Sequence, residues 1–533
     1  MKPKLDMGLS GDYEQILLGI SVKLNIQISE KGLSPSKGFP PSLFVLKVGM
    51  TSIVPEEDPE ATNSSVKETQ KCKTPWASIY LAGACAFVQA VQFGIFTSSM
   101  WPYLRKLNPQ AIETEFGYIL GLYSFAQCIS APLFGYWSNK IEQVRLPLLA
   151  GFAFMMAGNS LYLFLETVPS SNVVHAMMVA RVVAGCGTGN MSLLRAYVSM
   201  SSSRSDRSRA IACVSGGIAI GTLVGPAFQL LFTPLGPDGI RILPFLSLTI
   251  YSAPALFSLV LNVAGMMVIL FVFKEDYTVM HAAASAKGSA ELPSPCMIAV
   301  LVCVTTRFVQ IFGSATIGTL GSAFSMLMFS FNKEEAVLAS AASHLAAGVV
   351  GVILYFVFIF YDLTKCVPPR RATILVLTTY ICLYLFTLPW PFLPNKVEIS
   401  VNGSDAGCFA DRFSWCDDLT QVSPYVYYTM FVLVFGFGVS IMNIAITTLY
   451  SEVIGPRRQG TLQGLFQMSG SVGRMLAPLI TSFLYTAFGP QAPWLADIAV
   501  ISVIIACWII FRKKMVPLET RIVPKTSSPK DDC

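Results

Sequence analysis

Charged residues are scarce in this chain. Aspartate, glutamate, lysine and arginine make up 13% of its 533 residues, whereas soluble domains carry about 25%. The deficit excludes an ordinary soluble globular protein, and the 53% of apolar residues excludes a disordered or collagen-like chain. The net charge of +6 is too small to indicate a protein that binds nucleic acid.

Metal-binding and catalytic patterns are also missing from the sequence. The three histidines lie far apart, and none of the 13 cysteines has the spacing of a metal site. We therefore expect no metal ion and no cofactor. No nucleophile–base pair or nucleotide-binding motif stands out, which argues against an enzyme.

What the chain has in abundance is long apolar runs. Its mean hydropathy is +0.59, and the runs approach the ~20 residues that a helix needs to cross ~30 Å of hydrocarbon. Only helices and closed barrels satisfy every backbone polar group in lipid. Because the runs are continuous rather than alternating, we predict an all-α polytopic membrane protein.

Twelve apolar runs are predicted to be transmembrane helices, six on each side of a polar segment. The first six are expected at 75–104, 116–137, 146–165, 173–200, 210–232 and 249–273, and the second six within 296–329, 336–361, 372–391, 425–450, 460–488 and 494–511. The predicted domains are a cytosolic tail (1–74), a six-helix half (75–273), a cytosolic linker (274–293), a second six-helix half (294–512) with a polar loop (392–421), and a cytosolic tail (513–533).

The orientation follows from the distribution of lysine and arginine among the loops. The loops on the side of the two chain ends hold more of these residues than the opposite loops, so both termini are predicted to be cytosolic. The loop 392–421 then faces a lumen or the outside. Its sequon at Asn402 is a candidate for N-glycosylation. Cys408 and Cys416 are a candidate disulfide, with two free thiols as the alternative.

An internal repeat relates the two halves. Gly221 and Pro226 of the fifth run correspond in register to Gly473 and Pro478 of the eleventh. An asparagine followed by a tyrosine at the same spacing recurs in the fourth and tenth runs. We therefore expect two pseudo-symmetric halves, in which these glycines and prolines also permit close packing and bending.

Twelve helices in two homologous halves resemble the major facilitator superfamily. Its loop 2–3 motif is similar to a segment containing Gly135, Asn139 and Lys140, in which Asn139 replaces the usual aspartate and weakens the expected charge pairing. Its helix 5 motif is similar to the segment containing Gly221, Gly225 and Pro226. The resemblance implies the major facilitator fold and a transport function.

A narrower resemblance, from about residue 75 to 512, is to the lysosomal ceroid-lipofuscinosis branch of that superfamily. Segments 99–106, 133–139, 407–408 with 415–416, and 473–478 carry it. It implies a glycosylated endolysosomal membrane protein for which chloride permeation is the proposed activity.

The N-terminal tail contains two strings typical of lysosomal sorting signals. Tyr13 and Ile16 form a Tyr-x-x-apolar string, and Leu17 and Leu18 follow acidic residues at slightly short spacing. Adaptor complexes read such strings, so adaptors are predicted partners. Chance occurrence is the alternative because the strings are short.

Buried charge in the predicted helices is mainly positive. An unpaired arginine in a membrane stays protonated and needs an anion. Arg474 and Arg181 are therefore predicted to attract a transported anion, with Arg307 on the same path. Thr222, which corresponds to Arg474 in the repeat, is predicted to donate its hydroxyl. The alternative is that arginines bind backbone carbonyls or extend to the interface, as expected for Arg195.

These patterns favour an anion-permeating or anion-exporting facilitator of the endolysosome, embedded in the lipid bilayer, with chloride or a small organic anion as substrate. A proton-linked exporter of a neutral or cationic metabolite is the first alternative. A non-transporting sensor or scaffold that keeps the fold is the second.

Overall fold

The computed structural model describes residues 73–236, 239–243, 246–285, 293–361, 367–399, 407–408, 413, 415–416 and 419–518. All of them belong to one compact unit, Asp58–Cys533. The predicted sorting residues at 13–18 and the sequon at Asn402 lie outside the described residues.

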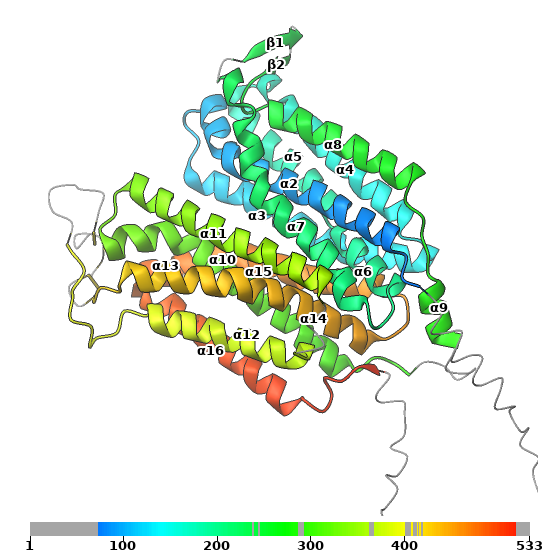
Figure 1. The fold of residues 1–533 in the computed structure, drawn as a ribbon. Helices are drawn as coiled ribbons and strands as arrows, with labels where there is room; N and C mark the ends of the chain where they lie inside the picture. Colours follow the sequence, from blue (N-terminus) through cyan, green and yellow to red (C-terminus); the bar gives the residue numbers. More distant parts are fainter. Residues whose placement is uncertain are drawn as a thin grey trace, which may run out of the picture. The chain divides into compact units, whose positions relative to one another are not determined.

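The first half of the described chain is helical except for one small hairpin (Figure 1). Its helices are α2 (Trp76–Leu107), α3 (Glu113–Ile141), α4 (Arg145–Leu163), α5 (Val173–Thr188), α6 (Met191–Ser201), α7 (Arg207–Leu230) and α8 (Ala253–Phe271). Between α7 and α8, the strands β1 (Ile240–Leu243) and β2 (Leu246–Leu248) pair in antiparallel fashion, with Ile240 opposite Leu248.

The second half follows a short linker helix, α9 (Thr278–Ser285). Its helices are α10 (Met297–Phe329), α11 (Lys333–Phe360), α12 (Pro369–Thr387), α13 (Pro424–Leu433), α14 (Val439–Ile454), α15 (Gly460–Phe488) and α16 (Gln491–Ile510). Every predicted run holds a helix or a pair of helices. In the part of the chain that the structure describes, 9 helical stretches are long and apolar enough to cross a membrane. The helical membrane fold is therefore confirmed, while twelve crossings stay a prediction.

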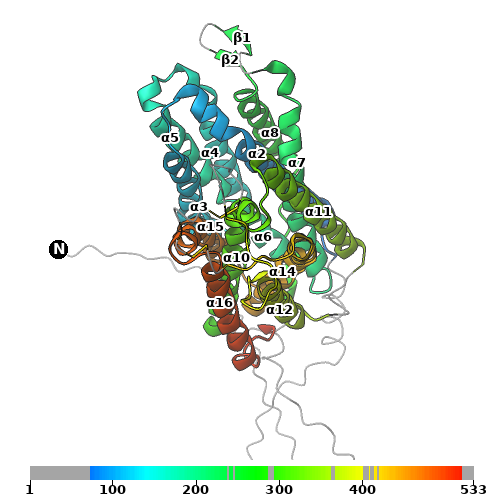
Figure 2. The same cartoon turned by 90° about the vertical axis from the view of Figure 1, so that its left-hand side faces the viewer.

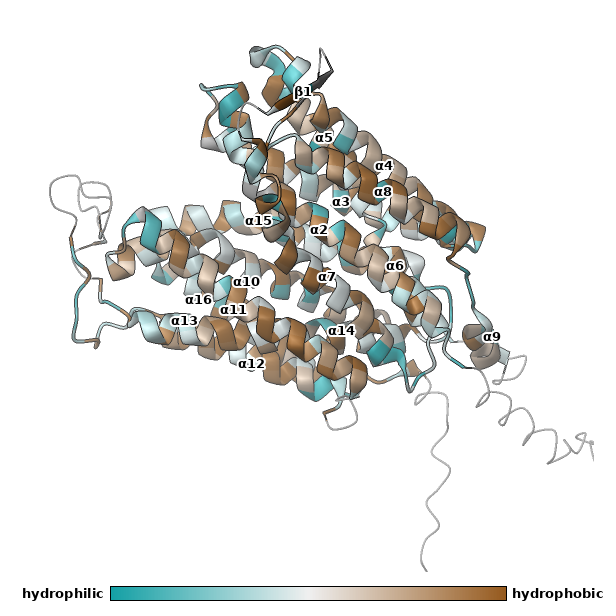
Figure 3. Ribbon diagram, turned by 45° about the horizontal axis from the view of Figure 1, so that its top comes forward, coloured by the Kyte–Doolittle hydropathy of each residue, from teal (hydrophilic) through white to brown (hydrophobic). Residues whose placement is uncertain are grey.

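Hydrophobic residues, brown in Figure 3, run through the helices, and many large apolar side chains are exposed on the outside of the bundle. Leu338 of α11 and Ile510 of α16 are 71% and 70% exposed. Large exposed apolar surfaces are unfavourable in water and are suited to lipid. Polar side chains lie inside instead, where the Gln92 amide donates to Asn262 and accepts from Asn159. This distribution is typical of a helical membrane protein.

Two predicted helices are interrupted in the structure. The run 173–200 divides into α5 and α6 at Gly189, where the backbone N–H of Asn190 donates to Gly187 three residues back. A Cβ at Gly189 would lie 2.8 Å from the backbone nitrogen of Ala131, so the turn brings α3 into close contact. The run 425–450 contains a π-helical turn, η5 (Val434–Gly438), between α13 and α14. Such turns are frequent at functional sites.

The repeat motifs lie at equivalent helix contacts in the two halves. In α7, a Cβ at Gly221 would be 2.6 Å from the Phe87 carbonyl oxygen of α2. In α15, a Cβ at Gly473 would be 3.0 Å from the Phe308 carbonyl oxygen of α10. Gly225 likewise meets Gly94 of α2. These are the close approaches that the packing interpretation predicts.

The bundle has two ends, a termini side and a hairpin side. The termini side is where the described chain begins and ends: Thr74 donates to Asp206 before α7, and Arg370 at the start of α12 donates to the carbonyl of Met515. The hairpin side carries β1 and β2, at the opposite end of the first-half helices (Figure 2). We predict from the distribution of basic residues that the termini side is cytosolic.

Candidate functional site

The two halves enclose a cavity of about 340 Å³, which we call the central cavity. It is lined by α2, α3, α5, α6 and α7 of the first half and by α10, α14 and α15 of the second. Arg195 of α6, Arg307 of α10 and Arg474 of α15 all line it. No acidic residue is among its described lining residues, so the site carries an excess of positive charge.

The three arginines form hydrogen bonds with uncharged side chains. Their guanidinium groups donate to side-chain amide oxygens: Arg195 to Gln467, Arg307 to Gln310 and Asn443, and Arg474 to Gln127. Within the described chain none of the three arginines forms an ion pair. The positive charges of Arg195 and Arg474 also repel the positive charge of Arg307. An anion between them would relieve this repulsion, which weak dielectric screening strengthens.

A network of amides and hydroxyls orients Arg474. Its Nη2 lies 2.6 Å from Gln127 Oε1 of α3, and Ser471 of α15 donates to the same oxygen at 2.9 Å. Because Gln127 belongs to the first half and Arg474 to the second, the network joins the two halves. Sequence reasoning missed Gln127, although a glutamine inside an apolar run is a signal that could have identified it.

A second network places Arg307. Its Nη1 donates to Asn443 Oδ1 at 2.5 Å and to Gln310 Oε1 at 2.9 Å. Asn443 in turn donates to the hydroxyl of Tyr355 at 3.2 Å, which connects α10, α14 and α11. Arg307, which the sequence predicts to lie on the anion path, lines the central cavity.

Two expectations change at the central cavity. The prediction that Arg195 extends to the interface is wrong: the side chain is 8% exposed and lies against Gln467, because every residue of α6 is buried. Thr222 lines the cavity, but its hydroxyl donates to the Ile218 carbonyl at 2.8 Å. In this structure the Thr222 proton is therefore not available to an anion.

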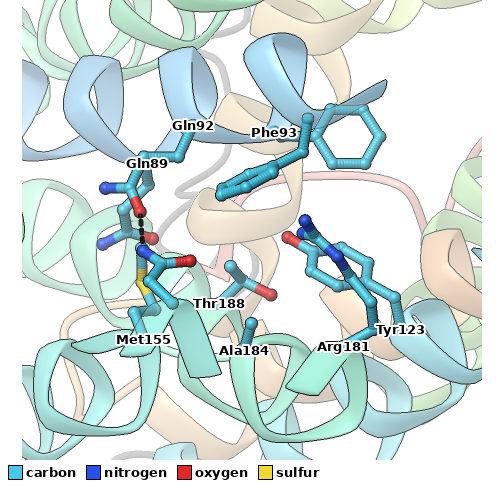
Figure 4. Close-up of a pocket in the computed structure, with 10 residues that line it drawn as sticks. Gln89, Gln92, Phe93, Tyr123, Met155, Arg181, Ala184 and Thr188 are labelled. Carbon is cyan, nitrogen blue, oxygen red and sulfur yellow. Dashed lines mark hydrogen bonds between the residues drawn. The ribbon is translucent and has the colours of Figure 1, made fainter. Parts of the chain in front are cut away.

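Arg181 lies outside the central cavity lining. Its guanidinium carbon is 4.0 Å from the ring centroid of Phe96 and 4.8 Å from that of Tyr162. The side chain is 6% exposed, and its Nε and Nη2 atoms have no hydrogen-bond partner among the described residues. Figure 4 shows the guanidinium beside the Tyr123 ring, at the edge of a void of about 20 Å³. Space of this size suits a water molecule.

A larger cavity of about 800 Å³ lies between α2, α3, α5 and α15. We call it the hairpin-side cavity, because it is lined by the hairpin-side ends of α2, α3 and α15. Phe93, Tyr123 and Arg474 line both this cavity and the central one. Arg181 also lines it, so both arginines predicted to attract the anion line this cavity, whereas only Arg474 of the two lines the central one.

On the termini side, α3 and α15 close against each other. Asn139 Nδ2 donates to Thr461 Oγ1 at 2.9 Å, and the backbone N–H of Gly460 donates to Asn139 Oδ1 at 2.9 Å. The Asn139 side chain thus binds the first turn of α15 by two hydrogen bonds, although it lacks the charge of the aspartate that is usual at this position. Arg458 adds an ion pair with Glu142 at 3.5 Å. Lys140 is exposed in the last turn of α3, where a cation is favourable.

The described residues of the polar loop include a disulfide between Cys408 and Cys416, with Cα atoms 5.8 Å apart. Both cysteines are buried. The free-thiol alternative is not what the structure contains.

Comparisons with known proteins agree with this architecture. The family model for the Major Facilitator Superfamily matches residues 82–410 and 413–531. The Major facilitator superfamily domain-containing protein 8 of Xenopus laevis is 29% identical over 488 residues, which cover 85% of this chain and 94% of that protein.

Solved structures show the same fold at low sequence identity. The human organic anion transporter MFSD10 (TETRAN) superposes with a TM-score of 0.56 at 15% identity, over 85% of this chain and 100% of that one. The transporter FucP in the outward conformation gives a TM-score of 0.58 at 14% identity, over 82% and 98%. Since the family model covers most of the sequence, the chain belongs to the Major Facilitator Superfamily and is a multi-pass membrane transport protein.

Proposed function

We propose that this transporter carries a small anion, chloride or a small organic anion, across the endolysosomal membrane. The observation that supports the proposal is the set of three arginines, Arg195, Arg307 and Arg474, which line one cavity and are held by neutral amides. The cavity lies between the two halves, where the substrate sites of such repeats are found.

Electrostatics favours an anion over the other substrate classes. Arginine stays protonated at every physiological pH, and two unit charges 4 Å apart interact by about 4 kcal/mol at an effective dielectric of about 20. A cation entering the cavity would add to the repulsion. A neutral solute would leave the repulsion among the arginines unchanged, whereas an anion would be attracted by all three of them.

One observation supports the alternative of a proton-linked exporter. Asp497 of α16 is a carboxylate that is 3% exposed and lies against Tyr384 and Thr316. It lines neither the central nor the hairpin-side cavity. If protons couple transport through this residue, Asp497→Asn removes the pH dependence of uptake. If the anion proposal is correct, Arg474 variants reduce the flux while Asp497→Asn does not.

The test is chloride flux into proteoliposomes at pH about 5 and about 7, with wild type, Arg474→Ala and Arg474→Gln. A hydrogen bond to a charged group contributes about 1.5–3 kcal/mol, so the flux at low chloride is expected to fall about 10- to 150-fold. Arg371→Ala, at an exposed arginine near the start of α12, is the matched control. Unchanged flux in both Arg474 variants would refute the proposal.

The endolysosomal location is part of the proposal. The strings that contain Tyr13, Leu17 and Leu18 support it, and the Cys408–Cys416 disulfide supports a loop that faces an oxidising lumen. Replacing these three tail residues by alanine is expected to move the protein from lysosomes to the cell surface, as measured by surface biotinylation. Retention in lysosomes would show that the tail strings do not sort it.

A further inference from the structure

We infer that the hairpin-side cavity holds the apolar body of an amphipathic organic anion, whose acidic head group is bound by Arg181 and Arg474. This inference rests on the proposed function, because it assigns the chemical class of the anion that the arginines attract.

The size of the cavity is the first argument. Its volume of about 800 Å³ is far larger than the roughly 30 Å³ share of one water molecule, so a bare halide would leave it almost empty. Cavities of about 300–1,000 Å³ are those that enclose drug-sized ligands. Gly117 and Gly121 of α3 line the cavity, and a Cβ at either one would meet nothing within 4 Å. The wall therefore leaves open space along this part of α3.

The chemistry of the wall is the second argument. Apart from its two arginines, the cavity is lined mainly by apolar side chains of α2, α3 and α15, among them Phe96, Met100, Leu120, Met475 and Leu479. No acidic residue is among the described lining residues. An apolar body is favoured against this wall, and a cationic one is repelled by the arginines.

The position of the arginines is the third argument. Arg181 is buried with Nε and Nη2 free of hydrogen-bond partners among the described residues, and unsatisfied buried donors are costly. An acidic head group supplies acceptors for them. Arg181 belongs to α5 of the first half and Arg474 to α15 of the second. The hairpin-side cavity thus receives one arginine from each half, and Arg474 lines the central cavity as well.

The experiment compares four probes in proteoliposomes of the full-length protein: naphthalene-2-sulfonate, methanesulfonate, chloride and naphthylmethyl-trimethylammonium. Wild type is expected to take up naphthalene-2-sulfonate with a KM at least 10-fold below that of methanesulfonate, which has the same head group without the apolar body. The ammonium probe, which has the body and the opposite charge, is expected not to be taken up.

Variants locate the site. Gly121→Leu and Gly117→Leu fill the cavity and are expected to lower the ratio of naphthalene-2-sulfonate to chloride uptake at least 10-fold. Arg181→Gln is expected to raise the KM for naphthalene-2-sulfonate, and Arg181→Lys is expected to restore part of the loss. Leu133→Trp adds bulk to the same helix at a side chain that is 61% exposed and lines neither cavity, and it should leave the ratio unchanged.

The outcomes separate this inference from the proposed function. Arg474-dependent chloride flux with equal KM values for the two sulfonates overturns the inference alone. Uptake ratios that stay at the wild-type value in both glycine variants also overturn it. Absence of Arg474-dependent flux for every anion overturns the inference together with the proposed function. Because the comparison of probes uses wild type, it stands even if a variant fails to fold.

Discussion

The contact that closes the termini side depends on a glycine. Gly135 of α3 faces the start of α15, and a Cβ there would overlap the Gly460 carbonyl, 2.6 Å from its carbon atom and 3.0 Å from the Cα of Thr461. Both neighbours are backbone atoms, so no side-chain rotation can relieve the overlap. Gly135→Ala therefore forces α3 and α15 apart by on the order of 1 Å, to reach an ordinary carbon–carbon separation.

The cost follows from the hydrogen bonds one turn away. Asn139 makes two bonds of 2.9 Å to Thr461 and Gly460, and a separation of about 1 Å takes both beyond hydrogen-bond distance. Each bond contributes about 0.5–1.5 kcal/mol. The closed state thus loses about 1–3 kcal/mol, which shifts the ratio of closed to open molecules by about 5- to 150-fold.

Hydrogen–deuterium exchange in lipid nanodiscs measures this shift. Peptides that cover 135–141 and 459–466 are expected to exchange faster in Gly135→Ala than in wild type. Gly117→Ala is the matched control, since it is the same change in the same helix and its Cβ meets nothing within 4 Å. The two variants share the gain in helix propensity, so it cancels in the comparison. Equal exchange in both would refute the reasoning.

Three further changes test other contacts. Phe93→Ala removes one of the two rings, 5.8 Å apart, that line both cavities. If these rings form a constriction between the cavities, chloride flux in proteoliposomes should rise several-fold, and a fall in flux would contradict the constriction. Arg307→Met removes one of the three charges of the central cavity and should raise the KM for chloride, whereas an unchanged KM would exclude Arg307 from the path. Gly221→Leu places a side chain against the Phe87 carbonyl; at about 1–3 kcal/mol for overpacking, it should lower the unfolding temperature in detergent, which the same change at Gly117 should not do.

The helices themselves could be predicted from the sequence because the cause is local. A long continuous apolar run needs only lipid on its outside and its own backbone hydrogen bonds to become a helix. The run at 460–488 coincides with α15 (Gly460–Phe488), and the others agree within a few residues. The scarcity of acids and the presence of arginine in these runs are equally local, so composition alone indicates a positively charged interior.

The interruptions of the helices depended on neighbours in space. The division at Gly189 follows from the close approach of α3. The π-helical turn at Val434–Gly438 lies beside α11, where a Cβ at Gly436 would be 2.8 Å from a methyl carbon of Val350. Neither contact can be recognised from the hydropathy of the interrupted run.

The composition of the site was decided by tertiary structure. Sequence position placed Arg195 near a helix end and grouped Arg181 with Arg474 on the anion path. Packing instead buried Arg195 with Arg307 and Arg474 in the central cavity, and it placed Arg181 between Phe96 and Tyr162, where it lines only the hairpin-side cavity of the two. The rotation of each helix about its axis determines which face meets the cavity, and that rotation is fixed by contacts between residues hundreds of positions apart. The sequence by itself thus determined a helical transport protein with a positively charged interior. Only the packing of its two halves decided which arginines act together.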